Sequence, residues 1–388
     1  MIDFVFQNPT KIYFGKSALS NLKSEAAHWG ERVLLVYGGG SIKRTGVYDQ
    51  VMAQLAGTQV WELGGVQPNP RLSLVREGIR LCHEHDIQLV LAVGGGSAID
   101  TAKAVANGAC YDGDVWDLFD GKGRNTEVLP LGTVVTIPAA GSEMSDSCVI
   151  TREEDLCKRG RNTPLNFPKF SILNPEFTYT LPPFQTACGV VDIMAHMMER
   201  YFTRVTHVEL IDRMTEGALK TVVGNAPIVM HEPENYDARA EIMWAGCLAH
   251  NTLFQTGRVG DWASHQLEHE LGGMFDVAHG AGLAAVWGSW ARYVCGEKPQ
   301  RFAQFAHRIF GIPCQGDAKE TALKGIEAME DFYRSIGMPV NIRELGCELT
   351  EEQIATLAEK CCFGGRTIGL FKVLGKEDIR EIYRMAKG

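Results

Sequence analysis

The feature that most constrains the fold is a change of periodicity near residue 180. Before it, helical stretches separate four runs rich in β-branched residues, at 32–39, 59–65, 87–96 and 131–138. Such alternation is typical of a parallel sheet covered on both faces. After TYTLPPFQ (178–185), the apolar spacing is helical throughout. The sequence therefore predicts a Rossmann-like α/β domain over residues 1–180 and an all-α domain over residues 181–388.

Composition excludes several classes of function. The net charge is −9 and long basic runs are missing, so no nucleic-acid partner is expected. No apolar run approaches the roughly 20 residues of a membrane helix, and the opening residues lack the pattern of a secretory signal. The eleven cysteines are scattered without a C-x-x-C pair, which predicts reduced thiols and a cytoplasmic location.

Two of the predicted strands end in glycine-rich segments of identical sequence, GGGS, at 38–41 and at 94–97. A strand that runs through glycines into a helix brings backbone amides onto a pyrophosphate at the positive end of that helix. A tight turn alone could also require the glycines, but two such segments at strand ends favour a dinucleotide site. Ser97 is expected to cap the helix after the second segment.

The first glycine segment also bears on which dinucleotide binds. NAD sites commonly place a carboxylate on the adenosine ribose hydroxyls near a strand end. Residues 38–44 hold no acid, and Lys43 and Arg44 supply two cations for a 2′-phosphate. The sequence therefore predicts NADP(H).

The stretch DWASHQLEHELGGMFDVAHG (261–280) is rich in histidine. His265, Glu268 and His269 spell H-x-x-E-H, a zinc-peptidase signature. Asp192 and His196 lie four residues apart on another predicted helix, and therefore on one face of it. A carboxylate and imidazoles form a plausible set of ligands for a divalent metal, although a buried hydrogen-bonded pair would also account for Asp192 and His196.

The chain resembles the iron-containing (group III) alcohol dehydrogenases, especially their NADPH-dependent butanol dehydrogenase and aldehyde reductase branch. The resemblance runs essentially end to end. It rests on GGGSIKRTGVYDQV (38–51), GGVQPNPRL (64–72), AVGGGSAIDTAKAVA (92–106), TIPAAGSEMS (136–145), LNPEFTYTLPP (173–183) and GVVDIMAHMMERYF (189–202).

The resemblance implies a dehydroquinate synthase-like architecture, NADP(H) and one divalent metal ion, Fe²⁺ or Zn²⁺. It assigns the metal ligands to Asp192, His196, His265 and His279, and proton transfer near the metal to His269. It assigns the cofactor contacts to Gly38, Gly39, Ser41, Asn69, Gly95, Gly96, Ser97, Asp100, Thr136 and Lys158, with Arg159 or Arg161 as alternatives to Lys158.

The implied activity is hydride transfer between NADP(H) and a small aldehyde or primary alcohol. The alternatives are a glycerol dehydrogenase or dehydroquinate synthase-like enzyme of the same fold and, more remotely, the zinc peptidase. In the dehydrogenase reading Glu268 merely lies on its helix, so Glu268→Gln should have little effect. The apolar segment MIDFVFQNP is expected to form a hairpin with TKIYFGK and to pair with a second copy, giving a homodimer.

Overall fold

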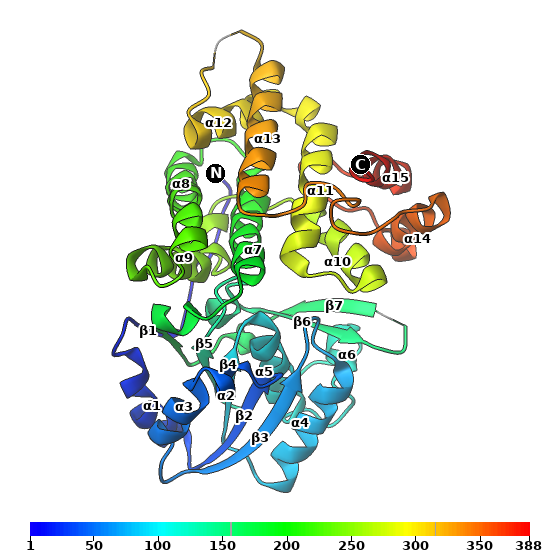
Figure 1. Cartoon of the computed structure of the whole chain (residues 1–388). Coiled ribbons are helices and arrows are strands. Elements are labelled where there is room, and N and C mark those ends of the chain that lie inside the picture. The colour runs from blue at the N-terminus through cyan, green and yellow to red at the C-terminus, as the bar shows by residue number, and fades with distance from the viewer. Residues whose placement is uncertain (156, 315) are drawn as a thin grey trace. The chain divides into compact units, whose positions relative to one another are not determined.

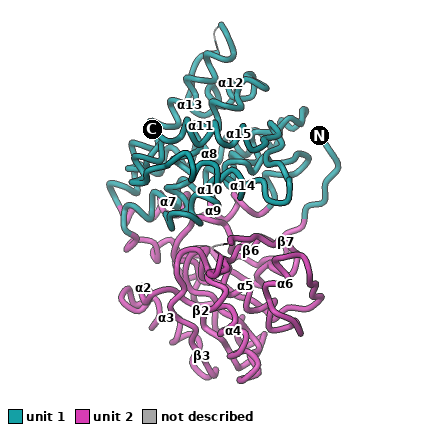
Figure 2. Tube along the Cα trace, turned by 90° about the vertical axis from the view of Figure 1, so that its right-hand side faces the viewer, with its two compact units in different colours: residues 1–6, 182–232, 252–388 teal, residues 7–181, 233–251 magenta. Residues whose placement is uncertain are grey.

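The computed structural model describes residues 1–155, 157–314 and 316–388. They form two compact units, which Figure 2 colours separately. The α/β unit contains residues 7–181 and 233–251, and the helical unit contains residues 1–6, 182–232 and 252–388. The sequence predicted two domains divided at residue 180. It did not predict that residues 1–6 belong to the helical unit or that residues 233–251 belong to the α/β unit.

The larger of these two differences is the position of helix α9 (Tyr236–Ala249), which was expected in the all-α domain but belongs to the α/β unit. Its Met243 and Cys247 are buried in the same cluster as strand residues Leu34 and Val36. Helical periodicity shows that a face is apolar, but it does not show which core that face joins.

The α/β unit is built on six parallel strands in the order β1-β8-β5-β4-β2-β3, with helices along both faces (Figure 1). The strands are β1 (Lys11–Phe14), β2 (Arg32–Gly38), β3 (Gln59–Val66), β4 (Leu89–Gly94), β5 (Leu131–Val135) and β8 (Phe170–Leu173). The principal covering helices are α1 (Leu22–Trp29), α3 (Val47–Gln54), α4 (Leu72–Glu84) and α5 (Gly96–Gly108).

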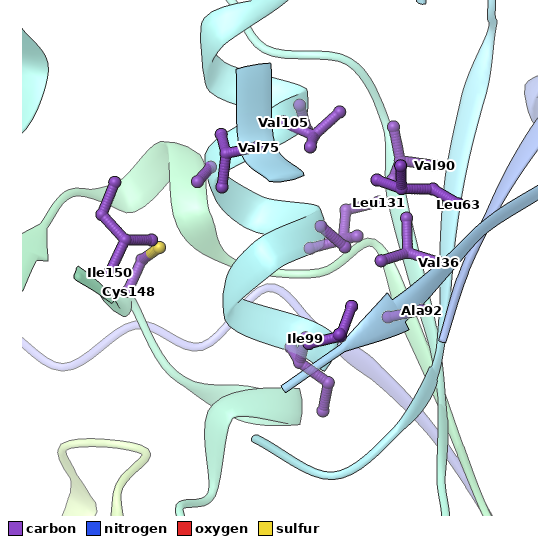
Figure 3. Packing of buried hydrophobic residues seen from close by; sticks show 14 of the residues in the cluster. Val36, Leu63, Val75, Val90, Ala92, Ile99, Val105, Leu131, Cys148 and Ile150 are labelled. Atoms are coloured by element: carbon purple, nitrogen blue, oxygen red, sulfur yellow. The ribbon is translucent and has the colours of Figure 1, made fainter. Parts of the chain in front are cut away.

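The apolar runs of the central strands serve two cores at once. Leu34 and Val36 of β2 lie in the cluster that includes α4 and α5, whereas Val33 and Leu35 lie in the cluster that includes α1 and α3. Figure 3 shows the first cluster, with strand residues such as Val36 beside residues of the covering helices. A strand buried on both faces needs apolar residues at every position, because successive side chains point to opposite faces.

Two strand features differ from the sequence expectations. The prediction of an N-terminal hairpin was wrong, because β1 pairs in parallel with β8 and residues 1–10 form no strand. An antiparallel hairpin of β6 (Ser147–Arg152) and β7 (Cys157–Asn162) was not expected. Its polar second strand, CKRGRN, lacks the apolar alternation that identifies a strand.

The helical unit contains eight α-helices among the described residues, drawn from green to red in Figure 1. They are α7 (Pro183–Tyr201), α8 (Glu209–His231), α10 (Ala263–Phe275), α11 (His279–Val294), α12 (Pro299–Phe310), α13 (Ala318–Ser335), α14 (Glu351–Cys361) and α15 (Lys376–Ala386). Pro183 opens α7, where a proline costs no intrahelical hydrogen bond. Across the part of the chain that the structure describes, no helix is both long and apolar enough to span a membrane.

Candidate metal centre and cofactor site

The two glycine segments end neighbouring strands. Gly38 closes β2 and Gly94 closes β4, and these strands are paired in the sheet. From β2 the chain crosses to β3 on one side and then returns to β4 on the other. Such a reversal of strand order is where open α/β sheets bind ligands, beyond the carboxyl ends of the strands.

Helix α5 starts directly at this point, with Gly95 as its N-cap and Gly96 as its first residue. A β-carbon at Gly95 would lie 2.8 Å from Ile137 Cβ, and one at Gly96 would lie 2.9 Å from Ala140 Cβ. Close packing therefore requires both glycines independently of any phosphate. The Ser97 cap was wrong, because Ser97 lies inside the helix and the cap makes no side-chain hydrogen bond.

Asp100, on α5, connects this helix by hydrogen bonds to the chain at Ser142 and at Val149. Its two carboxylate oxygens accept hydrogen bonds from the Ser142 hydroxyl at 2.6 Å and from the Val149 amide at 2.9 Å. Burial raises the pKa of this carboxyl, and the nearby Lys103 charge is the largest factor that opposes the rise. Both oxygens are therefore engaged in positioning the chain, which leaves Asp100 a structural role beside any cofactor contact.

Two cations considered for the cofactor have protein partners. Lys43 Nζ lies 2.9 Å from Glu62 Oε2, so it is less available to a 2′-phosphate than the sequence indicated. Arg161 donates to the side-chain oxygens of Asn107 at 2.9 Å and Asn125 at 2.6 Å. The remaining expected cofactor contacts also lie in the α/β unit. Thr136 follows β5, and its amide donates to the carbonyl oxygen of Gly94. Asn69 follows β3 with a φ of +56°, and Lys158 lies on β7.

The expected metal ligands come from three helices of the helical unit. Asp192 and His196 lie one turn apart on α7, His265 lies near the start of α10, and His279 is the first residue of α11. Ligand atoms of Asp192, His265 and His279 all lie within 4.8 Å of one another. The His196 ring centroid is 4.7 Å from that of His265, so all four side chains meet.

The distances in this group fit a shared cation. Asp192 Oδ1 lies 3.2 Å from His196 Nδ1, 3.8 Å from His265 Nε2 and 3.7 Å from His279 Nε2. The longer two exceed hydrogen-bonding distance, whereas tetrahedral ligands about 2.1 Å from one ion stand roughly 3.4 Å apart. Among the described residues, Asp192 Oδ1 and His265 Nε2 are buried atoms that make no hydrogen bond of ordinary geometry, although His196 Nδ1 lies within reach of Asp192 Oδ1. Buried polar atoms require a partner, and a divalent cation would serve both.

Each of two histidines also contacts a buried glutamate. His265 Nδ1 lies 2.8 Å from Glu199 Oε1, which also accepts from the Ser264 hydroxyl and the His265 amide. Burial alone lowers the pKa of His265, but contacts with Asp192 and Glu199 outweigh it and raise that pKa to about 9. The site therefore attracts positive charge. Sequence reasoning missed Glu199, although it follows Asp192 by seven residues and so shares its face of α7.

The expectation that Glu268 merely lies on its helix was wrong. Glu268 is fully buried, and its Oε2 contacts Nδ1 of His279. The hydrogen bond crosses from α10 to α11, so spacing within one helix does not reveal it. A glutamate that is bound to the imidazole in this way is not free to activate water, which removes the basis of the zinc-peptidase reading.

His269 lies one turn after His265 on α10. Its ring centroid is 5.7 Å from that of His279 and 6.4 Å from that of His265, and the side chain is partly exposed. His269 is therefore close to the metal group while remaining accessible to solvent.

Family models match both units of the molecule. Residues 9–175 match the model described as iron-containing alcohol dehydrogenase, and residues 186–387 match the C-terminal model of the Fe-containing alcohol dehydrogenase family. Together these matches cover nearly the whole chain.

Individual relatives agree over their full length. The chain is 44% identical to a probable NADH-dependent butanol dehydrogenase 1 of Bacillus subtilis, covering 99% of each chain. It is 37% identical to the NADPH-dependent aldehyde reductase YqhD of Escherichia coli, covering 100% of each. The crystal structure of NADH-dependent butanol dehydrogenase A from Thermotoga maritima superposes with a TM-score of 0.96 at 40% identity, covering 100% of this chain and 99% of that one. The chain belongs to the iron-containing alcohol dehydrogenase family.

Proposed function

We propose that this metal-dependent alcohol dehydrogenase transfers hydride between NADP(H) and a small aldehyde or primary alcohol. In this proposal Asp192, His196, His265 and His279 hold a single divalent ion, Fe²⁺ or Zn²⁺. The observation that carries it is the convergence of ligand atoms from α7, α10 and α11, with buried atoms of Asp192 and His265 that make no hydrogen bond of ordinary geometry among the described residues.

When bound, the divalent ion supplies Lewis acidity at the carbonyl oxygen and the reduced nicotinamide supplies the hydride. Asp192 contributes the one negative charge among the ligands, and the neutral imidazoles keep the total ligand charge low. His269 stands beside this group and passes the proton between the alcohol oxygen and solvent. An ordinary imidazole titrates near ~6.5 and can exchange protons at neutral pH.

The substrate is a small uncharged carbonyl compound. Arg258 is the cation in the sequence just before the metal-binding histidines, where a phosphate-binding enzyme of this fold would use basic residues. It is buried, and its guanidinium already donates to Asp212 Oδ1 at 2.7 Å and to the Thr215 hydroxyl at 2.7 Å, so its donors are engaged within the protein. Relatives named for butanol and for aldehydes, at 44% and 37% identity, support this substrate class, whereas relatives named for choline and for 1,3-propanediol are 30% and 27% identical.

Metal removal tests the proposal. Protein treated with a strong chelator is expected to lose aldehyde reduction, and Fe²⁺ or Zn²⁺ added afterwards should restore it. NADPH binding, followed by fluorescence of the nicotinamide, should persist in the metal-free protein, because its expected contacts lie in the α/β unit. Full turnover without any metal would contradict the assignment.

The preference for NADPH rests on the segment after β2. Relatives named for NADH and for NADPH both match this chain. The proposed preference is therefore argued from the residues that follow β2. Nothing lies within 4 Å of the position of a Gly39 β-carbon, and Arg44 Nη1 lies 3.9 Å from that of Gly40. An adenosine 2′-phosphate at this segment would meet open space, backbone amides and a guanidinium.

Gly39→Asp is expected to reverse the preference. The carboxylate would repel a 2′-phosphate and accept hydrogen bonds from the ribose hydroxyls of NADH. The ratio of kcat/KM with NADPH to that with NADH should fall by about tenfold or more, which is about 1.4 kcal/mol per factor of ten. Gly217→Asp is the control, since this exposed position on α8 also has nothing within 4 Å. A parent enzyme that prefers NADH would overturn the proposal.

The protein is further proposed to be a cytoplasmic homodimer. Apolar side chains at the N-terminus are exposed, with Phe4 at 53% and Val5 at 93%, and β1 lies at an edge of the sheet. Exposed apolar segments and strand edges favour pairing between chains. All eleven cysteines are free thiols, as a reducing compartment would keep them. Light scattering measures the mass, and a monomer at working concentration would contradict the dimer.

A further inference from the structure

We propose that Glu268 and Glu199 are positioning residues that fix the orientation and tautomer of the two metal-facing histidines on α10 and α11. The proposal rests on the metal ligands assigned above. It concerns residues outside that ligand set and assigns each glutamate to one imidazole.

The geometry is the same at both histidines. Each imidazole turns Nδ1 toward a glutamate and Nε2 toward Asp192 Oδ1. His265 contacts Glu199 and His279 contacts Glu268 through Nδ1, while their Nε2 atoms lie 3.8 Å and 3.7 Å from Asp192. A carboxylate accepts hydrogen bonds and does not donate them, so it holds the proton on Nδ1. The lone pair of each ring is then on Nε2, the atom that faces the common centre.

Burial makes the two glutamates effective in this role. Glu268 is 0% exposed and Glu199 is 2% exposed, so water competes little with the imidazoles for their oxygens. A buried carboxylate is costly unless a hydrogen bond or a positive charge compensates it. With metal bound, each histidine conveys part of the ion's charge to its glutamate, which strengthens the hydrogen bond and raises the basicity of the ligand.

Packing holds Glu268 in place from both helices. A β-carbon at Gly272 would lie 2.7 Å from Glu268 Oε1, and one at Gly282 would lie 2.9 Å from Glu268 Cγ. The side chain therefore lies in a narrow space between α10 and α11 that two glycines leave open. Its carboxylate has little freedom to turn away from His279.

Glu268→Gln and Glu199→Gln test the proposal in the full-length protein, with Co²⁺ as the probe. Each amide preserves the shape of the side chain and removes its charge. We expect the Co²⁺ dissociation constant, measured by competition with a chromophoric chelator, to rise by about tenfold to a hundredfold. We also expect the visible absorption bands of bound Co²⁺ to shift, since these bands report the ligand field.

Glu216→Gln is the matched control. Glu216 is also buried in the helical unit, but its carboxylate contacts Tyr201 and Arg308. The variant should lose stability without a change in Co²⁺ affinity or spectrum. Glu268→Ala gives a second measurement, and its Co²⁺ affinity should fall at least as far as that of Glu268→Gln.

The outcomes separate this inference from the proposed metal site. If the parent binds Co²⁺ no better than His265→Ala does, the ligand assignment itself fails. If the parent binds Co²⁺ tightly and Glu268→Ala, like both glutamine variants, matches its affinity within twofold and its spectrum, only the positioning role fails, because alanine removes the acceptor that a glutamine oxygen could still supply. If Glu216→Gln also loses Co²⁺ affinity, and the variants of Glu268 and Glu199 lose no more than it does, the positioning role is likewise overturned, because the loss then reflects general destabilisation.

Discussion

His265→Ala and His279→Ala are each expected to abolish metal retention and to lower aldehyde reduction by about a thousandfold or more, since the loss removes the Lewis acid together with a ligand. The two imidazoles and Asp192 form the group whose ligand atoms lie within 4.8 Å of one another. Metal content by elemental analysis, beside NADPH oxidation, measures both effects on the same samples.

His269→Ala is the companion variant. It should retain the metal and turn over more slowly, because His269 is assigned to proton transfer and not to the ligand set. Retention of metal by His279→Ala together with its loss from His269→Ala would refute the ligand assignment. The structure makes that comparison informative, because ligand-type atoms of Glu268, His269 and His279 also lie within 4.8 Å of one another.

Gly280→Ala is expected to destabilise the helical unit by about 3 kcal/mol, at the upper end of typical overpacking costs. A β-carbon at Gly280 would lie 2.1 Å from the backbone oxygen of Cys188. Because the obstacle is the backbone of α7, a change of rotamer cannot relieve the clash. Helix α11 would have to move away from α7, which carries His279 away from Asp192. Metal occupancy should therefore fall together with the unfolding temperature.

Gly217→Ala supplies the comparison for this effect. It also replaces a helical glycine, on α8, but nothing lies within 4 Å of its β-carbon position. Alanine should stabilise that helix by about 0.5–1 kcal/mol through backbone entropy. Thermal unfolding of the metal-free proteins gives both values, and a Gly280→Ala variant as stable as Gly217→Ala would show that α7 and α11 can separate at little cost.

Much of the site was readable from residue types and spacing. Asp192 and His196 share a helix face because they are four residues apart, and the glycine segments follow apolar runs that were predicted to be strands and form β2 and β4. The resemblance to iron-containing alcohol dehydrogenases was confirmed by both family models. The preference for NADPH and the roles of His269 and Lys158 stay predictions.

Other features could not be read in this way. The hairpin of β6 and β7 has a charged strand whose position depends on its partner and not on its own apolar pattern. Lys43 was expected near a phosphate, but its ammonium pairs with Glu62, which lies nineteen residues away on β3. In each case the position of a polar segment depends on a partner strand or side chain, which its own residue pattern does not reveal.

By itself, the sequence determined the parallel sheet, the helical second half and the kinds of side chain available for a metal, because periodicity and composition are local properties. Only the tertiary structure decided that α9 joins the α/β unit and that Glu199 and Glu268 each contact a metal-facing histidine. The physical reason is that a buried carboxylate must find its hydrogen-bond donor across a packed interface. Which donor it meets depends on how closely α7, α10 and α11 approach, and that approach is set by contacts such as the one between Gly280 and Cys188.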